Sequence, residues 1–356
     1  MQILEDEFNK SIAELTASAK TEAELEAIAA TAPEMLNDIL SNLPKKMLES
    51  IKKDAYQGGL DEIRRMHTDF NARNYNRWKK GFDALELLIE ICTEAGENFN
   101  KRLGPAANKN GDILRDTLTR IHAKGCLVAK EISCLLANGF ADGAHARWRA
   151  LHELTVTSKY LALKGNDTAE RYVAHEYIES YKGACQHKAY ESRLQAAPPS
   201  DDVISRLRTR HDEAIARYGD NFSNPYGWAE QSLGKKRANF ADLEKAVALD
   251  HWRPYYKWAS QNIHASAKTI NFSLGLTEAS TNLLLVGSSD SGMTDPAHSM
   301  AISLSQTTVN LLSISPNIDA LVTMKIILDL SNEIGELFLE AHRQRVKSGT
   351  NETPYY

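Results

Sequence analysis

The stretch that most constrains the fold is Trp252-Arg-Pro-Tyr-Tyr-Lys-Trp-Ala-Ser-Gln-Asn-Ile-His-Ala-Ser-Ala-Lys268. It has no strand-like alternation and is expected to form one helix. At about 100° per residue, Arg253, Ser260 and His264 fall within roughly 40° of one another, and Tyr256 lies beside them. A polar stripe therefore runs along a largely apolar helix. Such a stripe faces either water or a buried group that satisfies it.

The same helical pattern recurs along the whole chain. Ala, Leu, Glu and Lys are abundant, apolar residues recur at spacings of three and four, and no internal repeat is found. The sequence predicts an all-α protein in which a helical-bundle domain follows an N-terminal helical region. The expected helices span residues 3–18, 21–30, 33–55, 59–66, 74–100, 112–138, 141–164, 167–195, 200–218, 239–248, 252–269, 297–314 and 318–346, with irregular structure at 219–238.

Several residues mark the expected helix ends. Thr21, with a glutamate three residues later, fits a capping box. Pro33 suits the first position of a helix, and Gly104-Pro105 predicts a break that leads into a loop. Gly139 and Gly165 stand where C-terminal caps are expected.

Charge and composition suggest a division into regions. We expect a charged N-terminal helical region at 1–105, the helical bundle at 106–347 and a flexible tail at 348–356. Residues 1–40 hold nine acidic and two basic side chains, whereas residues 45–80 hold ten basic and five acidic ones. This pattern fits a solvated helical surface, an acidic segment docked on a basic surface, or a basic face for a phosphate polymer.

Bulk composition narrows the class of protein. The chain has 356 residues, 42% of them hydrophobic and 25% charged, with a net charge of −5, which argues against bulk electrostatic capture of nucleic acid. Four cysteines without a C-x-x-C pair indicate reduced thiols in a cytoplasmic protein. No signal peptide and no membrane span are expected, because no apolar run approaches about 18 residues.

Motifs of several enzyme classes are absent from the sequence. It contains no dinucleotide fingerprint, P-loop, H-E-x-x-H motif or Glu-x-x-His pair. His175 and Glu179 share a helix face, but no third ligand lies at helical spacing from them. We therefore expect neither a cofactor nor a metal ion.

The segment 146–155 carries the first candidate group of functional residues. Arg149 and Glu153 are four residues apart, so they share a helix face and can pair. The pair is either structural or holds Arg149 ready for an anion such as phosphate. Arg147 and His152 also form an Arg-x4-His pattern, a spacing used by a large class of helical ribonucleases, although His152 equally suits a packing or surface position.

The second candidate group is the polar stripe of residues 253–264. His264 is either a core histidine that hydrogen-bonds Ser260 or Tyr256, or a general acid or base tuned by them. We expect this stripe to face that of Arg149, so that Arg149 and His264 share one cavity.

These two segments together resemble a bacterial family of uncharacterised proteins, domain of unknown function 5677. The resemblance rests on Arg149-Ala-Leu-His-Glu153, the following Tyr160-Leu, and Tyr256-Lys-Trp-Ala-Ser260-Gln-Asn-Ile-His264-Ala-Ser266, and covers about 115–270. It implies an all-helical fold. Some such families resemble the HEPN ribonucleases of toxin and phage-defence systems, which carry Arg-x4–6-His at a dimer interface. Here only Arg147 and His152 have that spacing.

Two functions follow as hypotheses. The leading one is a metal-independent, RNA-cleaving effector of bacterial stress or phage defence, acting as a homodimer on RNA. The alternative is a non-catalytic helical interaction or sensor module that binds a neighbouring-gene protein; a small-ligand enzyme also stays open. The expected catalytic residues are Arg149, Glu153, Tyr256, Ser260 and His264, and the expected substrate-binding residues are Arg147, His152, Arg253 and Lys257.

Overall fold

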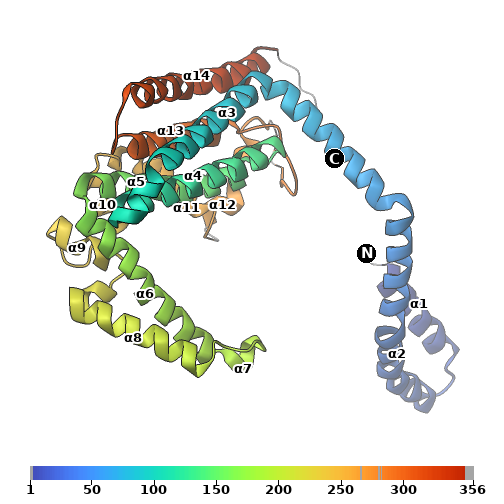
Figure 1. The fold of residues 1–356 in the computed structure, drawn as a ribbon. Helices are drawn as coiled ribbons and strands as arrows, with labels where there is room; N and C mark the ends of the chain where they lie inside the picture. Colours follow the sequence, from blue (N-terminus) through green and yellow to red (C-terminus); the bar gives the residue numbers. More distant parts are fainter. Residues whose placement is uncertain (1–2, 265–266, 280, 282, 349–356) are drawn as a thin grey trace. The chain divides into compact units, whose positions relative to one another are not determined.

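The computed structural model describes residues 3–264, 267–279, 281 and 283–348. No strand occurs in these ranges, and the all-α prediction is confirmed (Figure 1). Ser266 of the family resemblance and residues 349–356 of the expected flexible tail lie outside the described residues.

Contacts between residues divide the chain into two units, Met1–Phe70 and Asn71–Tyr356. We call them the N-terminal unit and the main unit. The domain boundary expected near residue 105 stays a prediction. The helix break expected at Gly104-Pro105 is wrong, because one helix, α3 (Leu60–Asn110), continues through it.

The N-terminal unit consists of α1 (Ile3–Ser18), α2 (Glu22–Asp54), the π-helical turn η1 (Ala55–Gly59) and the first part of α3. The capping box of Thr21 is confirmed. The two helices expected at 21–30 and 33–55 are one helix, because Pro33 lies inside α2 without a residue of positive φ to end it. None of the side chains described in this unit is buried.

A kink separates α2 from α3. Gln57 and Gly58 leave helical geometry, and Gly58 has a φ of 131°. That value lies in a region which side chains with a Cβ atom rarely adopt. Glycine at this position therefore accounts for where the kink occurs.

The main unit holds the rest of the helices (Figure 1). They are α4 (Ile113–Ala137), α5 (Ala141–Lys164), α6 (Asn166–Ala189), α7 (Glu191–Leu194), α8 (Asp201–Tyr218), α9 (Gly227–Leu233), α10 (Phe240–Ala246), α11 (Arg253–Gln261), α12 (Ala267–Asn271), α13 (Thr294–Leu312) and α14 (Ile318–Ser348), with 3-10 turns η2 (Asp220–Ser223), η3 (Asp250–Trp252) and η4 (Leu274–Leu276).

Two expectations in this unit need correction. The helix expected at 252–269 ends at Gln261, and Asn262 is its C-cap. Asn favours caps and turns over helix interiors because its side chain competes for backbone hydrogen bonds. Residues 219–238 are not wholly irregular, since they contain η2 and α9.

A first apolar cluster joins α3, α4, α5, α13 and α14. Trp78 of α3 stacks on Phe338 of α14 with ring centroids 5.5 Å apart, and Phe82 meets the same ring edge-on. The helices approach closely because Gly81 has no side chain: a Cβ there would lie 2.6 Å from the Phe338 ring. This cluster forms the core of the bundle.

A second apolar cluster lies around α6, α8, α9 and α10. It includes the buried side chains of Tyr160, Ile178, Phe222, Trp228 and Leu243. Helices α6 and α8 lie side by side (Figure 1). The two clusters meet along α5, which supplies side chains to both.

Candidate functional site

The candidate site lies where α11 packs against α5. Arg149, His152 and Glu153 are i, i+3 and i+4 on α5, so they project toward one side of that helix. We use the name arginine–tyrosine cluster for the six residues that meet here: Arg149, His152, Glu153, Glu244, Arg253 and Tyr256.

One half of the cluster is a three-way contact of Arg149, Glu153 and Tyr256. The Nε of Arg149 donates to Glu153 Oε1 and to the Tyr256 hydroxyl, both at 3.0 Å. The Tyr256 hydroxyl donates to the same Glu153 oxygen at 2.5 Å. The guanidinium also lies 5.0 Å from the centroid of the Tyr256 ring. These contacts fix the position of the Arg149 guanidinium from two helices at once.

This arrangement leaves the outer end of Arg149 unused. Nε donates both hydrogen bonds, and no bond from either terminal amino group is found among the described residues. The side chain is 25% exposed. The two terminal amino groups can therefore take an external acceptor.

The other half of the cluster centres on Glu244 of α10, which is fully buried. Its Oε1 contacts His152 Nε2 at 3.0 Å, and its Oε2 accepts from Arg253. A buried carboxylate needs such partners, because losing hydration without them is costly. The Arg253 guanidinium lies 5.4 Å from the centroid of the Tyr256 ring. Two guanidinium groups therefore lie against one phenol ring.

The Tyr256 phenol of the cluster and the phenol of Tyr226 both stay protonated. Burial raises the pKa of Tyr256, and its hydrogen bond to Glu153 raises the pKa further. Burial also raises the pKa of Tyr226, and the Glu153 carboxylate raises it further. The Tyr256 hydroxyl therefore acts as a hydrogen-bond donor to Glu153.

Two residues of the predicted stripe lie beyond this cluster. Ser260 donates its hydroxyl to the Tyr256 carbonyl at 2.7 Å. His264 is exposed in the turn after α11. In the described part of the chain, no hydrogen bond, ion pair or ring contact joins His264 to Arg149. The shared cavity and the catalytic role of His264 stay predictions.

The Arg-x4-His pair does not assemble on one face. Arg147 pairs with Glu131 of α4, whereas His152 is buried against Glu244. Residues five apart are about 140° apart around a helix, so they face different neighbours. Lys257 is exposed beside the cluster.

Sequence reasoning missed Glu244 and the burial of His145. Glu244 sits in a short helix, and nothing in its local pattern indicates that it is fully buried. His145 is also buried, between the rings of Trp148 and Trp258 at 5.5 and 5.0 Å. Neither of its ring nitrogens has a partner among the residues that the structure describes, and burial lowers its pKa to about 4. Its i, i+3 spacing to Trp148 is the one signal that could have placed it in the core.

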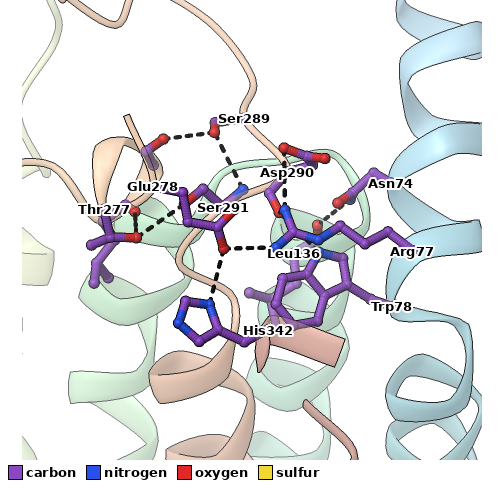
Figure 2. Close-up of polar contacts among 12 residues, drawn as sticks. Asn74, Arg77, Trp78, Leu136, Thr277, Glu278, Ser289, Asp290, Ser291 and His342 are labelled. Carbon is purple, nitrogen blue, oxygen red and sulfur yellow. Dashed lines mark hydrogen bonds and ion pairs between the residues drawn. The ribbon is translucent and has the colours of Figure 1, made fainter. Parts of the chain in front are cut away.

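A second polar network ties Glu278 and Asp290 to the bundle (Figure 2). Arg77 of α3 bonds Glu278 at 2.6 Å and the Asp290 carbonyl at 2.6 Å, and Trp78 donates to the same carbonyl at 2.9 Å. His342 of α14 contacts Glu278 at 2.9 Å. Because Arg77 and Glu278 are each only 12% exposed, this is a largely buried anchor that joins Glu278 to α3 and α14.

A cavity of about 520 Å³ lies elsewhere, between the start of α4 and the paired helices α6 and α8. Arg217 of α8 pairs with Glu170 of α6 at 2.6 Å on its wall. The residues that line this cavity do not include any member of the arginine–tyrosine cluster. Within the described residues, no three His, Cys, Asp or Glu side chains are arranged to hold a metal ion.

Comparison with known proteins gives a family match. Residues 115–281 match the model of a family of unknown function (DUF5677), which confirms the resemblance expected over 115–270. The matched range includes the whole arginine–tyrosine cluster. No curated protein and no solved structure matches the chain. Among the described residues, no helix combines the length and apolar character needed to cross a bilayer.

Proposed function

We propose that the protein is a metal-independent, RNA-cleaving effector of bacterial stress or phage defence that works in the cytoplasm. The observation that supports it best is the pair of guanidinium groups on the Tyr256 ring, with the terminal amino groups of Arg149 unused. Parallel N–H groups of arginine suit two oxygens of one phosphate. The cluster therefore offers a preorganised position for a backbone phosphate.

The charges of the cluster favour short-range contacts with one phosphate over long-range attraction of a nucleic acid. Arg149 and Arg253 are balanced by Glu153 and Glu244. A balanced cluster binds a phosphate through directed hydrogen bonds rather than through a broad positive field. This fits a chain whose net charge is −5.

The proposed chemistry uses His264 as the proton acceptor. The imidazole takes the proton of a ribose 2′-hydroxyl, and the resulting oxygen attacks the adjacent phosphorus. The 5′-oxygen leaves with a proton from water, which gives a 2′,3′-cyclic phosphate and a 5′-hydroxyl. His264 lies in the turn after α11, eight residues beyond Tyr256. A bound strand would therefore run along α11, with one phosphate at Arg149 and the reacting one nearer His264.

The test compares purified wild-type protein with His264→Ala on total RNA. We expect the variant to cleave at least ~100-fold more slowly, as is typical for loss of a general base. His251→Ala is the matched control, because His251 is also exposed and lies just before α11. Equal cleavage by wild type and His264→Ala, or no cleavage by wild type, contradicts the proposal.

The alternative, a non-catalytic interaction or sensor module that binds a neighbouring-gene protein, is favoured by one observation. Glu244 is fully buried and satisfied by His152 and Arg253, as expected for a structural network. Tyr256→Phe separates the two functions, since it keeps the ring but removes the bonds to Arg149 and Glu153. A structural role predicts a loss of about 1–2 kcal/mol of unfolding free energy and unchanged RNA affinity. A phosphate site predicts weaker RNA binding.

A further inference from the structure

Helix α2 carries an apolar stripe that the described residues of its own unit leave uncovered. Leu25, Leu36, Leu40, Met47 and Ile51 are between 41% and 61% exposed. Their positions follow helical spacing, so they lie along one side of the helix. A stripe of this length on a surface helix is unusual unless it binds something.

The short helix α1 covers only part of α2. It packs against α2, where Ile28, Met35 and Ile39 are half-buried. No side chain of α2 is fully buried. Helices draw most of their stability from packing of an apolar face. The hairpin of α1 and α2 has no buried core, so a partner must supply the other side of that packing.

The charges of α2 are divided between its two ends. The first half carries acidic residues and no lysine or arginine, and the second half is mainly basic. The acidic residues are Glu22, Glu24, Glu26, Glu34 and Asp38, and the second half carries Lys45, Lys46, Lys52 and Lys53 against Glu49 and Asp54. Two such helices in parallel would place like charges together. In an antiparallel pair, the acidic half of each meets the basic half of the other.

We propose that α2 pairs antiparallel with α2 of a second copy of this chain, stripe against stripe, around a two-fold axis. With 33 residues, α2 is about 50 Å long, which provides a contact along several helical turns. The two α1 helices would lie on the outside of the pair, as in a four-helix bundle made of two hairpins. This inference does not rest on RNA cleavage.

The charge division argues against other occupants. An anionic membrane surface would attract the basic half but repel the acidic half. A uniformly charged protein partner would match one half in the same way. A second copy of α2 matches both halves, because the helix is complementary to itself when reversed.

The first test measures the mass of the full-length protein in solution by light scattering and sedimentation over a range of concentrations. We expect a dimer for wild type. Leu36→Glu with Leu40→Glu should weaken self-association by at least ~100-fold, because each copy loses two leucines that the proposed dimer contact would bury. Leu163→Glu is the matched control, since Leu163 is 64% exposed on α5 and should leave the dimer intact.

The second test reverses charges to fix the direction of pairing. Glu24→Lys with Glu26→Lys, or Lys52→Glu with Lys53→Glu, should each weaken the dimer. All four changes in one chain should restore it, because the helix is again complementary to itself when reversed. In a parallel pair, the fourfold variant would still place like charges together. Its self-association would then show no recovery relative to the double variants.

Three outcomes would overturn the proposal. They are a monomeric wild type at every concentration, a dimer that survives Leu36→Glu with Leu40→Glu, and no recovery in the fourfold charge variant. Misfolding is distinguished by thermal unfolding, because these positions lie outside the core of the main unit and its transition should be unchanged. RNA cleavage is measured separately, so failure of the dimer proposal is distinguishable from failure of the proposed activity.

Discussion

The two units of the chain reach a helical structure in different ways. The main unit surrounds two apolar clusters, and its long helices bury side chains on several faces. The N-terminal unit has helices just as long, yet no described side chain there is buried. Helix-forming residues and caps alone can specify where helices lie, but packing supplies most of their stability. The stability of the N-terminal unit should therefore depend on a partner, whereas that of the main unit should not.

The largest difference between the units should appear when leucine is truncated. Leu85 is fully buried in the main unit, and Leu40 in α2 is 61% exposed. We expect Leu85→Ala to lower the unfolding free energy by about 3–5 kcal/mol, through lost transfer energy and a cavity. Leu40→Ala should change the main transition by less than about 0.5 kcal/mol. Chemical denaturation of both variants at low protein concentration checks this. Similar losses would break the distinction between the units.

Breaking an ion pair should show the same contrast between the two units, with somewhat smaller losses of unfolding free energy. Glu244→Ala removes a fully buried carboxylate and leaves Arg253 and His152 without their partner, which should cost about 3 kcal/mol. In the N-terminal unit, Asp61→Ala breaks the exposed pair with Arg64 and should cost less than about 0.5 kcal/mol. Thermal unfolding of each variant at neutral pH is the measurement. A small effect of Glu244→Ala would mean that water reaches the Glu244 site.

Acid should destabilise the main unit through buried histidine. Burial lowers the pKa of His145 to about 4, below its ordinary value of 6.5. Between these values the unfolded chain binds a proton that the folded chain does not, so stability falls as the pH drops from 6.5 toward 4. The contribution of His145 should be roughly 2–3 kcal/mol across that window. His145→Phe should flatten the pH dependence, and an unchanged slope would contradict the burial of a neutral imidazole.

A small effect confined to one helix end should come from a cap in the N-terminal unit. Thr21 accepts from the backbone of Glu24, and Glu24 bonds back to Thr21. Thr21→Ala should destabilise the start of α2 by about 1 kcal/mol, which increases amide exchange there roughly fivefold. The thermal transition of the main unit should not move. A shift of that transition would show that the two units unfold together.

The sequence predicted elements whose signals are local. The cap at Thr21 and the helix boundaries of α5 follow from residues next to each other. Pro33 was misleading because a proline in a helix removes one hydrogen bond but does not always end the helix. The helical period past Asn262 was equally misleading, because a periodic pattern does not show where a helix stops.

The residues of the candidate site also divide into those that the sequence could predict and those that it could not. Arg149 and Glu153 were predictable because they are i and i+4 on one helix. The contact with Tyr256 depended on α11 packing against α5, which the sequence only suggested. Glu244 was not predictable, since its burial comes from contacts with other helices rather than from its own segment. Local pairs are readable from one sequence, whereas partners from distant helices are not.

Residues 115–281, which match the family model, do not include all the helices that form the core of the bundle. Residues 115–281 contain the arginine–tyrosine cluster, but Trp148 within them donates to Ser303 of α13 at 2.9 Å, and its first cluster is completed by α3 and α14. A fragment cut at the limits of the sequence match would expose that tryptophan and its neighbours to water. It would also lose Arg77 and His342, the anchors of Glu278. Expression of residues 115–281 alone should therefore give an aggregating polypeptide.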